Sequence, residues 1–397
     1  MNNKIYISAA GSGKTTYILN QAINQLNQGL LDGKRILIVT FTNNNQNNIR
    51  ERILNKFGYI PKNIEVTGWY SFLLDYWIKP FKGSVIEQLY ERHVGFLFVE
   101  GISGIKTLKN GKHIYTYHND IEKFLDKKQN NFFSDKLAEF AYKCWEKNKE
   151  ELLERLSNIV DTLFIDEAQD LVAWDFELMK ILFKNSIIKC VICGDPRQFT
   201  YSTSPSNKHN KYQGDIARYV KDLVNTKRNK FVEIDYTTLS KSHRCNEFIC
   251  KFASTILPEY PPTEVCECCL DKRNLYKLPQ GVFLVKENDI KNYIKSYNPL
   301  SLRYSRATKI KVPTDRIMNW AESKGLEADS TLIYLTKTII EAYTPNKKRA
   351  IPDETKRKFY VAITRARFAV GIVVPNNFDN SIIDLPFWSD ITIKEKL

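Results

Sequence analysis

Long apolar runs are missing from this sequence: no stretch approaches the ~18 consecutive apolar residues of a membrane-spanning helix. Internal repeats and low-complexity tracts are missing too, which argues against solenoid and largely disordered architectures. No secretory leader is recognisable, because residues 1–4 run directly into a short apolar segment. The eight cysteines then fit reduced thiols. We therefore expect a soluble cytoplasmic protein without a membrane partner.

Acidic residues are in deficit, with 45 Asp and Glu against 59 Lys and Arg, so the net charge is +14. Such an excess favours a polyanionic partner, for which nucleic acid is one candidate. The composition is otherwise that of an ordinary globular protein, with 43% hydrophobic and 26% charged residues. At roughly 150 residues per domain, the 397 residues predict two or three domains.

A glycine-rich loop lies between a predicted strand at residues 5–7 and a predicted helix that begins near residue 14. This context is typical of a phosphate-binding loop, in which backbone N–H groups and the helix N-terminus surround phosphate oxygens. Lys14 would reach the β- and γ-phosphates, and the Thr15 hydroxyl would ligate Mg²⁺. An ordinary turn before a helix is the less favoured alternative. The ATP-binding residues predicted in this loop are Ala10, Gly11, Ser12, Gly13, Lys14, Thr15 and Thr16.

Two further predicted strands end in polar residues that suit ATP hydrolysis. The strand at residues 163–165 is followed by Asp166, which can hold Mg²⁺, and Glu167, which can deprotonate the attacking water. The strand at residues 188–193 leads to Gln198, placed to sense the γ-phosphate, and to Tyr201, whose ring can stack on a base. Parallel strands with their loops at one edge predict a doubly wound α/β sheet and a Mg²⁺-dependent ATPase.

The later motifs complete a series that resembles the UvrD/Rep-type superfamily 1 DNA helicases. The segments LSKSHR at 239–244, ESKGLE at 322–327 and YVAITRAR at 360–367 are similar to the last motifs of that family. The ordered motifs run from residue 5 to about residue 373, so the resemblance covers nearly the whole chain.

The resemblance implies a P-loop NTPase with two RecA-like, doubly wound parallel-sheet domains that bind ATP and Mg²⁺ in the cleft between them. We expect the first domain at residues 1–235, with a small, partly helical insert at about 84–150, and the second at 236–397. Segment patterns place strands of the second domain at 281–285, 308–312, 330–334 and 368–373, and a helical stretch at 133–157.

The resemblance also assigns roles to residues. Arg244 and Arg365 would neutralise charge on the γ-phosphoryl group, completing a catalytic set with Lys14, Glu167 and Gln198. Gly325 and Glu327 would lie near the nucleotide, and His243 could stack on the purine. Thr16 and His243 replace an Arg and a Tyr that hold the adenine in relatives, which predicts loose base selectivity. The residues expected to face single-stranded DNA are Phe41, Thr42, Asn43, Trp69 and Tyr201.

The leading hypothesis is an ATP-dependent helicase or translocase on single-stranded DNA or a tailed duplex, moving 3′ to 5′ as its relatives do. The alternative is a nucleic-acid-stimulated ATPase that regulates a partner such as a nuclease, with little unwinding of its own. An inactive homologue is disfavoured, because the residues expected to act on phosphate and magnesium are present: Lys14, Thr15, Asp166, Glu167, Gln198, Arg244 and Arg365.

The cysteines offer a further candidate site. Cys266, Cys268 and Cys269 are clustered, but their spacing fits no common zinc pattern. Cys190 and Cys193 have C-x2-C spacing, yet a strand would turn them to opposite faces. The sequence therefore favours plain thiols, with a metal or iron–sulfur site as the less favoured alternative.

Overall fold

The computed structural model describes residues 3–30, 33–99, 101–108, 113–185, 188–200, 204, 206–345 and 349–389. The chain forms two compact units. Unit 1 consists of Met1–Ile7, Lys14–Gly194 and Tyr201–Asp235, and unit 2 consists of Ser8–Gly13, Asp195–Thr200 and Tyr236–Leu397. The phosphate loop before Lys14 and the segment that carries Gln198 therefore group with unit 2.

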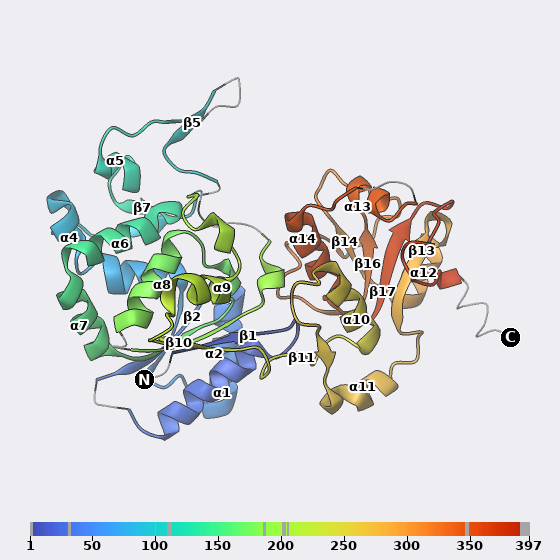
Figure 1. The fold of residues 1–397 in the computed structure, drawn as a ribbon, viewed down its shortest axis with the longest axis horizontal. Coiled ribbons are helices and arrows are strands. Elements are labelled where there is room, and N and C mark those ends of the chain that lie inside the picture. Colours follow the sequence, from blue (N-terminus) through green and yellow to red (C-terminus); the bar gives the residue numbers. More distant parts are fainter. Residues whose placement is uncertain are drawn as a thin grey trace. The chain divides into compact units, whose positions relative to one another are not determined.

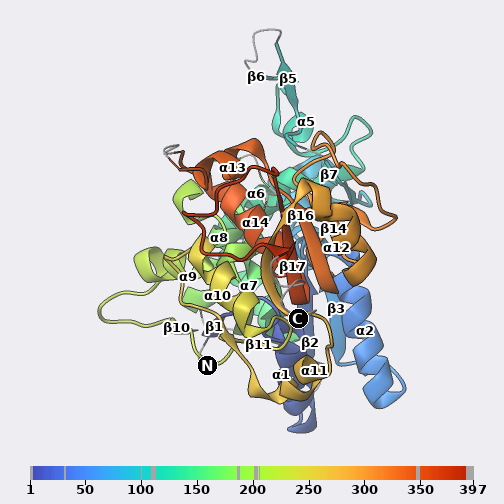
Figure 2. The same ribbon diagram turned by 90° about the vertical axis from the view of Figure 1, so that its right-hand side faces the viewer.

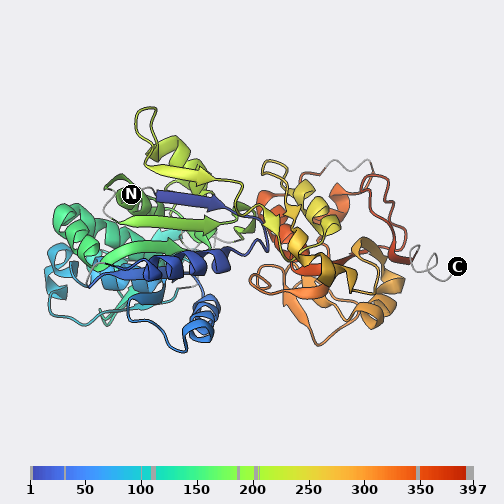
Figure 3. The same ribbon diagram turned by 90° about the horizontal axis from the view of Figure 1, so that it is seen from below.

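Unit 1 is built on a six-stranded parallel sheet in the order β10-β1-β9-β8-β2-β3, and Figure 3 shows blue β1 beside yellow-green β10. Its central strands are apolar at successive positions. In β2, the residues from Ile36 to Val39 are all fully buried, so both faces of this strand are covered. The strands are β1 (Asn3–Ile7), β2 (Arg35–Thr40), β3 (Ile64–Gly68), β8 (Val160–Ile165), β9 (Lys189–Gly194) and β10 (Val232–Asp235).

Helices connect these strands. The helix α2 begins after Thr42, whose side chain accepts a hydrogen bond from the Asn45 N–H, and ends at Gly58 in the left-handed conformation. The helical stretch predicted at 133–157 is confirmed in large part, but it is broken at Asn148 into α6 and α7. The helices are α1 (Lys14–Asn27), α2 (Asn43–Phe57), α3 (Trp69–Phe72), α4 (Lys82–Val85), α5 (Asp120–Phe124), α6 (Leu137–Lys147), α7 (Lys149–Ile159), α8 (Trp174–Asn185) and α9 (Ile216–Tyr219), with a π-helix at Leu73–Ile78.

Short strands form the insert between α4 and α6. The strands β4 (Gly95–Leu97) and β7 (Asn131–Phe133) pair in parallel, and β5 (Ile105–Thr107) and β6 (His113–Tyr115) form an antiparallel pair. In Figures 1 and 2 this second pair stands out from the rest of unit 1, next to α5.

Unit 2 contains a five-stranded parallel sheet in the order β13-β17-β16-β14-β15 (Figure 1). The strands are β13 (Gly281–Lys286), β14 (Leu300–Arg303), β15 (Ile317–Asn319), β16 (Ala328–Tyr334) and β17 (Ala366–Val374). A second, short parallel pair joins β11 (Lys241–Ser242) and β12 (Glu264–Val265). The helices are α10 (Glu247–Ile256), α11 (Leu270–Asn274), α12 (Ile290–Tyr297), α13 (Lys337–Ala342) and α14 (Asp353–Ile363).

One predicted strand of unit 2 is wrong. Residues 308–312 alternate apolar and basic side chains, but they form an irregular segment. Ile310 and Val312 still pack against the core of the unit, and the Tyr334 hydroxyl donates to the Val312 carbonyl. The strand position beside β14 is occupied instead by β15.

The predicted α/β class with two larger parallel sheets is confirmed. Among the described residues, no helix combines the length and the apolar character needed to cross a bilayer.

Candidate active site

Strand order brings the predicted catalytic segments to one edge of the unit 1 sheet. The strand β1 leads towards the phosphate loop, and β8 ends at Asp166. Only β9 lies between these two strands, and all three run in parallel. Their carboxyl ends therefore meet at one edge, about 10 Å apart for two strand spacings. The side chains that follow β8 are within reach of the first turn of α1.

The first turn of α1 contacts both acidic residues. The Thr15 hydroxyl donates to a carboxylate oxygen of Asp166 at 2.6 Å. The Lys14 ammonium lies 3.8 Å from a carboxylate oxygen of Glu167, and both side chains are largely buried. The structure thus brings together Lys14, Thr15, Asp166 and Glu167, four of the residues that the sequence predicted to act on ATP.

The backbone of Glu167 is left-handed, with φ of 60° and ψ of 41°. This conformation costs a non-glycine residue about 1–3 kcal/mol and is concentrated at functional sites. The Glu167 N–H donates to Asp166 at 3.0 Å, and the Gln169 side-chain amide donates to the Glu167 carboxylate. Gln169 is a contact that the sequence reasoning missed, although it lies in the same acidic motif.

The residues present fit a bound magnesium ion. Burial, followed by the charge of Glu167, raises the pKa of Asp166, while Lys14 and the Thr15 hydroxyl oppose the rise. A divalent cation would compensate this buried pair of carboxylates. A hydroxyl and a carboxylate oxygen are ligands that Mg²⁺ accepts. Thr15 and Asp166 are therefore the residues of this site that could hold the ion.

The phosphate loop itself has the features of an anion cradle. Gly11 and Gly13 have φ of 71° and 80°, a region that favours glycine. The Ser12 hydroxyl is buried and has no hydrogen-bond partner among the described residues. The His243 N–H donates to the Gly11 carbonyl at 2.9 Å. A Cβ on Gly11 would lie only 2.5 Å from the Cβ of Arg244, so the loop and this arginine are in close contact within unit 2.

Arg365 is almost fully buried and is held by several acceptors of unit 2. Its guanidinium donates to the Gln198 side-chain oxygen at 3.3 Å and to the Leu326 carbonyl at 3.2 Å. The Gln198 amide in turn donates to Asp195 at 2.9 Å. The structure therefore joins the glutamine and the second arginine of the predicted catalytic set.

Arg244 is oriented by the carboxylate of Glu327. Its Nε donates to Glu327 at 3.0 Å, and its Nη1 donates to the Thr364 carbonyl at 3.2 Å. Burial pushes the pKa of Glu327 up, but the hydrogen bonds and charges of Arg367 and Arg244 outweigh it and lower the pKa. Gly325, in the same predicted motif, has φ of 86° and allows the turn before Glu327.

Thr16 is exposed, and its hydroxyl accepts a hydrogen bond of 2.6 Å from the guanidinium of Arg52 in α2. The helicase resemblance places an arginine of relatives at this position. Here a guanidinium reaches the same place from a residue 36 positions along the chain. Sequence reasoning missed Arg52 because nothing in the local pattern links α2 to the phosphate loop.

The predicted DNA-facing residues lie in two places: Phe41 and Thr42 connect β2 to α2, which begins at Asn43, and Trp69 begins α3. Phe41 is half-buried and stacks on Trp69, with ring centroids 6.0 Å apart. Trp69 is only 2% exposed, and its Nε1 donates to Asp175 at 2.8 Å. The buried Trp69 ring therefore packs against Phe41 on its protein side. Thr42 and Asn43 are exposed. Tyr201 lies outside the described residues.

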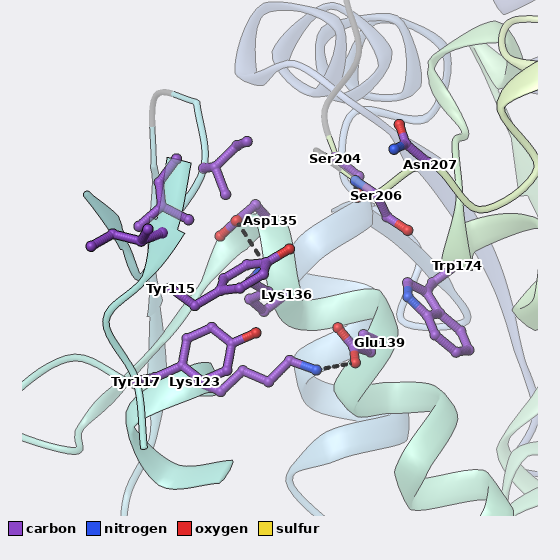
Figure 4. Close-up of a pocket in the computed structure, with 13 residues that line it drawn as sticks. Tyr115, Tyr117, Lys123, Asp135, Lys136, Glu139, Trp174, Ser204, Ser206 and Asn207 are labelled. Atoms are coloured by element: carbon purple, nitrogen blue, oxygen red, sulfur yellow. Dashed lines mark hydrogen bonds and ion pairs between the residues drawn. The ribbon is translucent and has the colours of Figure 1, made fainter. Parts of the chain in front are cut away.

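A second candidate site is a pocket lined in part by residues of the insert (Figure 4). Rings of Tyr115 and Tyr117 line it on one side and Trp174 on another. The cation of Lys123 is paired with Glu139. Because this lysine is already paired, the pocket is a weak candidate for phosphate binding compared with the loop before Lys14.

Three comparisons with known proteins bear on the chain. The family model of the UvrD/REP helicase N-terminal domain matches residues 1–135 and 104–213. A probable DNA helicase II homologue of Mycoplasma capricolum is 27% identical over 240 residues, which are 49% of this chain and 32% of that protein.

Solved structures of arterivirus nonstructural protein 10, a helicase, are also similar. The complex with DNA is 13% identical with a TM-score of 0.45, covering 96% of this chain and 63% of that one. The structure without DNA is 14% identical with a TM-score of 0.43, covering 94% and 60%. The chain thus spans about a third of the curated relative and less than two thirds of these helicases.

Proposed function

The chain belongs to the UvrD/REP helicase family, and on this premise we propose that it is an ATP-hydrolysing motor that acts on single-stranded DNA. The observation that carries the proposal is the meeting of Lys14 and Thr15 with Asp166 and Glu167 at the carboxyl edge of the unit 1 sheet. Phosphate binding and water activation require these groups together. Neither the lysine nor the carboxylates would suffice alone.

The phosphate loop and the first turn of α1 bind the triphosphate in this proposal. The N–H groups of the loop surround phosphate oxygens, and Lys14 supplies a positive charge to the β- and γ-phosphates. Thr15 and Asp166 hold Mg²⁺, which when bound neutralises charge on the phosphate oxygens. The hydrogen bond between Thr15 and Asp166 keeps these two oxygen atoms, which would hold the ion, 2.6 Å apart.

Glu167 is the general base of the proposed reaction. Its contacts with Lys14 and Gln169 fix the carboxylate, which accepts a proton from the attacking water. Arg244 and Arg365 supply positive charge for the γ-phosphoryl group as it is transferred. Two contacts support these roles: Arg244 touches Gly11 of the phosphate loop, and Arg365 donates to Gln198.

Phe41 is the proposed stacking platform for a base, supported by the buried ring of Trp69. Base stacking on an aromatic ring is worth about 1–3 kcal/mol and is indifferent to sequence, which suits a protein that moves along DNA. The exposed Thr42 and Asn43, which follow Phe41 in the chain, offer polar contacts to the DNA backbone. The net charge of +14 adds long-range attraction.

DNA duplexes with a single-stranded tail at either a 3′ end or a 5′ end test the proposal. We expect ATP-dependent strand separation or end-directed translocation, with preference for the 3′ tail. Glu167→Gln should bind ATP with unchanged affinity and lose turnover and movement, because only the proton acceptor is removed. Stimulated hydrolysis without movement on either substrate would favour the regulatory ATPase over the motor.

A further inference from the structure

Four metal-ligating side chains of unit 2 converge beside the phosphate loop. They are His243, Cys266, Cys268 and Cys269, and their ligand atoms all lie within 4.8 Å of one another. His243 Nδ1 is 3.1 Å from Cys268 Sγ, which is 3.2 Å from Cys266 Sγ and 3.9 Å from Cys269 Sγ. The candidate ligand set is therefore three thiols and one imidazole.

Backbone pairing explains why these residues meet. The strand β11 ends at Ser242, directly before His243, and β12 ends at Val265, directly before Cys266. These strands are parallel, with Ser242 opposite Val265, and the Cys266 N–H donates to the Ser242 carbonyl at 3.0 Å. The imidazole and the first thiol thus leave neighbouring strands at the same level. A 3-10 turn at Glu267–Cys269 then returns the other two thiols to them.

The spacing suits a single tetrahedral ion better than it suits free thiols. With Zn–S bonds of about 2.3 Å, sulfur ligands of a tetrahedral site lie about 3.8 Å apart. The observed separations of 3.2 and 3.9 Å lie on either side of this value. All eight cysteines are free thiols, so no disulfide accounts for the approach. Thiols are weak donors and acceptors and gain little from such crowding on their own.

A buried arginine, Arg273, supplies positive charge next to the cluster. Three thiolates and a neutral imidazole around Zn²⁺ would carry one net negative charge. Arg273 is buried, and its guanidinium lies 3.7 Å from Cys266 Sγ while donating to the Cys266 carbonyl at 2.6 Å. It also donates to the Ser242 carbonyl at 3.4 Å. Such an outer contact balances charge and orients a thiolate ligand, as is usual around zinc.

We propose that His243, Cys266, Cys268 and Cys269 form a closed structural site for one Zn²⁺ ion. Cys₃His is a common structural zinc set, and thiolates select zinc over magnesium or calcium. The ion would tie the chain after β12 to the residue that precedes Arg244. The backbone N–H of His243 also donates to the Gly11 carbonyl, and the Cδ2 edge of its ring is 3.7 Å from a Cβ placed on Gly13. The zinc site thereby stabilises the position of the loop that contains Gly11 and Gly13. That this loop binds phosphate rests on the proposed function.

The zinc content of the purified full chain tests this proposal. The protein is prepared with a thiol-free reductant, incubated with zinc chloride, desalted and analysed by plasma mass spectrometry. Cys268→Ser removes one ligand whose side chain is exposed, so the fold should tolerate it. Cys250→Ala is the control for loss of a thiol, because Cys250 is in the same unit and outside the cluster. Cobalt substitution reports thiolate ligation through its charge-transfer absorption.

We expect about one zinc ion per chain in the wild type and in Cys250→Ala, and at least about tenfold weaker zinc binding in Cys268→Ser. Absence of retained zinc, or equal retention in Cys268→Ser, would overturn the proposal. A Cys266–Cys268 disulfide in the metal-free protein, with no zinc uptake after reduction, would also overturn it. Since the readout needs no ATP, zinc binding without ATP hydrolysis would contradict the proposed function and leave the zinc site standing.

Discussion

The guanidinium of Arg365 donates to the side-chain oxygen of Gln198 at 3.3 Å, joining two residues that are 167 positions apart in the chain. Gln198 also donates to Asp195, so its oxygen is directed at the arginine. In the proposed function both side chains act on the γ-phosphate, so this hydrogen bond would couple their roles. A residue that responds to the γ-phosphate and a residue that stabilises its charge would then move together.

The pair should behave non-additively in kinetics. Arg365→Ala should lower the rate of hydrolysis by about 1,000-fold or more, as removal of an arginine finger does. Gln198→Ala should cost less alone and little more in the Arg365→Ala background, with a coupling of about 0.5–3 kcal/mol. Steady-state ATPase rates of the two single variants and the double variant measure this. Arg349→Ala is the control, because the exposed Arg349 pairs with Glu341 and has no part in the proposed reaction. Additive losses would contradict the pairing.

Gly11 should resist substitution more than another left-handed glycine. Gly11→Ala introduces a Cβ that would meet the Arg244 Cβ at 2.5 Å. Gly29 has φ of 90° but nothing within 4 Å of its hypothetical Cβ, so Gly29→Ala carries the backbone strain alone. We expect Gly11→Ala to weaken nucleotide binding by at least about tenfold, or about 1.4 kcal/mol. Equal affinities in the two variants, measured by titration with a fluorescent ATP analogue, would argue against the contact.

Arg52 should contribute to nucleotide affinity although it lies outside every predicted motif. Its guanidinium donates to Thr16, next to the residue that would ligate Mg²⁺. Arg52→Ala should raise the Kd for ATP several-fold and leave kcat at saturating ATP nearly unchanged, because the proposed chemistry does not use this side chain. Arg50→Ala tests the same helix at a guanidinium that donates instead to the Val66 carbonyl. A fall in kcat at unchanged Kd would refute this role.

Asp175 should make stability depend on pH. Burial raises the pKa of Asp175 from 3.8 to about 7, although the Val172 N–H and the Trp69 indole oppose the rise. The folded state then binds a proton more tightly than the unfolded chain, so this contribution is full below pH 3.8 and is lost as the pH rises through about 7. The whole change is on the order of 4 kcal/mol.

Asp175→Asn removes this titration. The free energy of unfolding of the wild type should therefore fall, relative to that of the variant, as the pH rises between 5 and about 7.5. Denaturant titrations at several pH values measure the difference, with Asp353→Asn as an exposed control. Parallel curves for the wild type and Asp175→Asn would show that the carboxyl does not retain its proton in the fold.

Features of the site that lie in contiguous motifs could be predicted from the sequence. A strand, a glycine turn and a helix place Lys14 and Thr15 by local structure alone. An apolar strand followed by Asp166 and Glu167 fixes their position at a sheet edge in the same way. The strands β1, β8, β9, β13, β16 and β17 were expected at nearly their observed positions, because each is a short apolar run. The roles of these residues in ATP turnover stay predictions.

Long-range relationships could not be predicted in this way. His243 joins the three cysteines only through the parallel pairing of β11 with β12, which no local pattern reveals. The contact between Arg52 and Thr16 depends on how α2 packs near α1. At residues 308–312, the alternation of apolar and basic side chains predicts a strand that does not form. The position beside β14 is occupied by β15 instead. Register and packing, not periodicity, decide such cases.

The rate of ATP hydrolysis with and without single-stranded DNA, with Lys14→Ala as the blank, decides whether the chain is a DNA-dependent ATPase. We predict magnesium-dependent hydrolysis that rises strongly on addition of DNA. Lys14→Ala should not hydrolyse ATP, because no ammonium group then balances the charge of the phosphates. Hydrolysis that is unaffected by DNA, or equal in wild type and Lys14→Ala, would contradict this prediction.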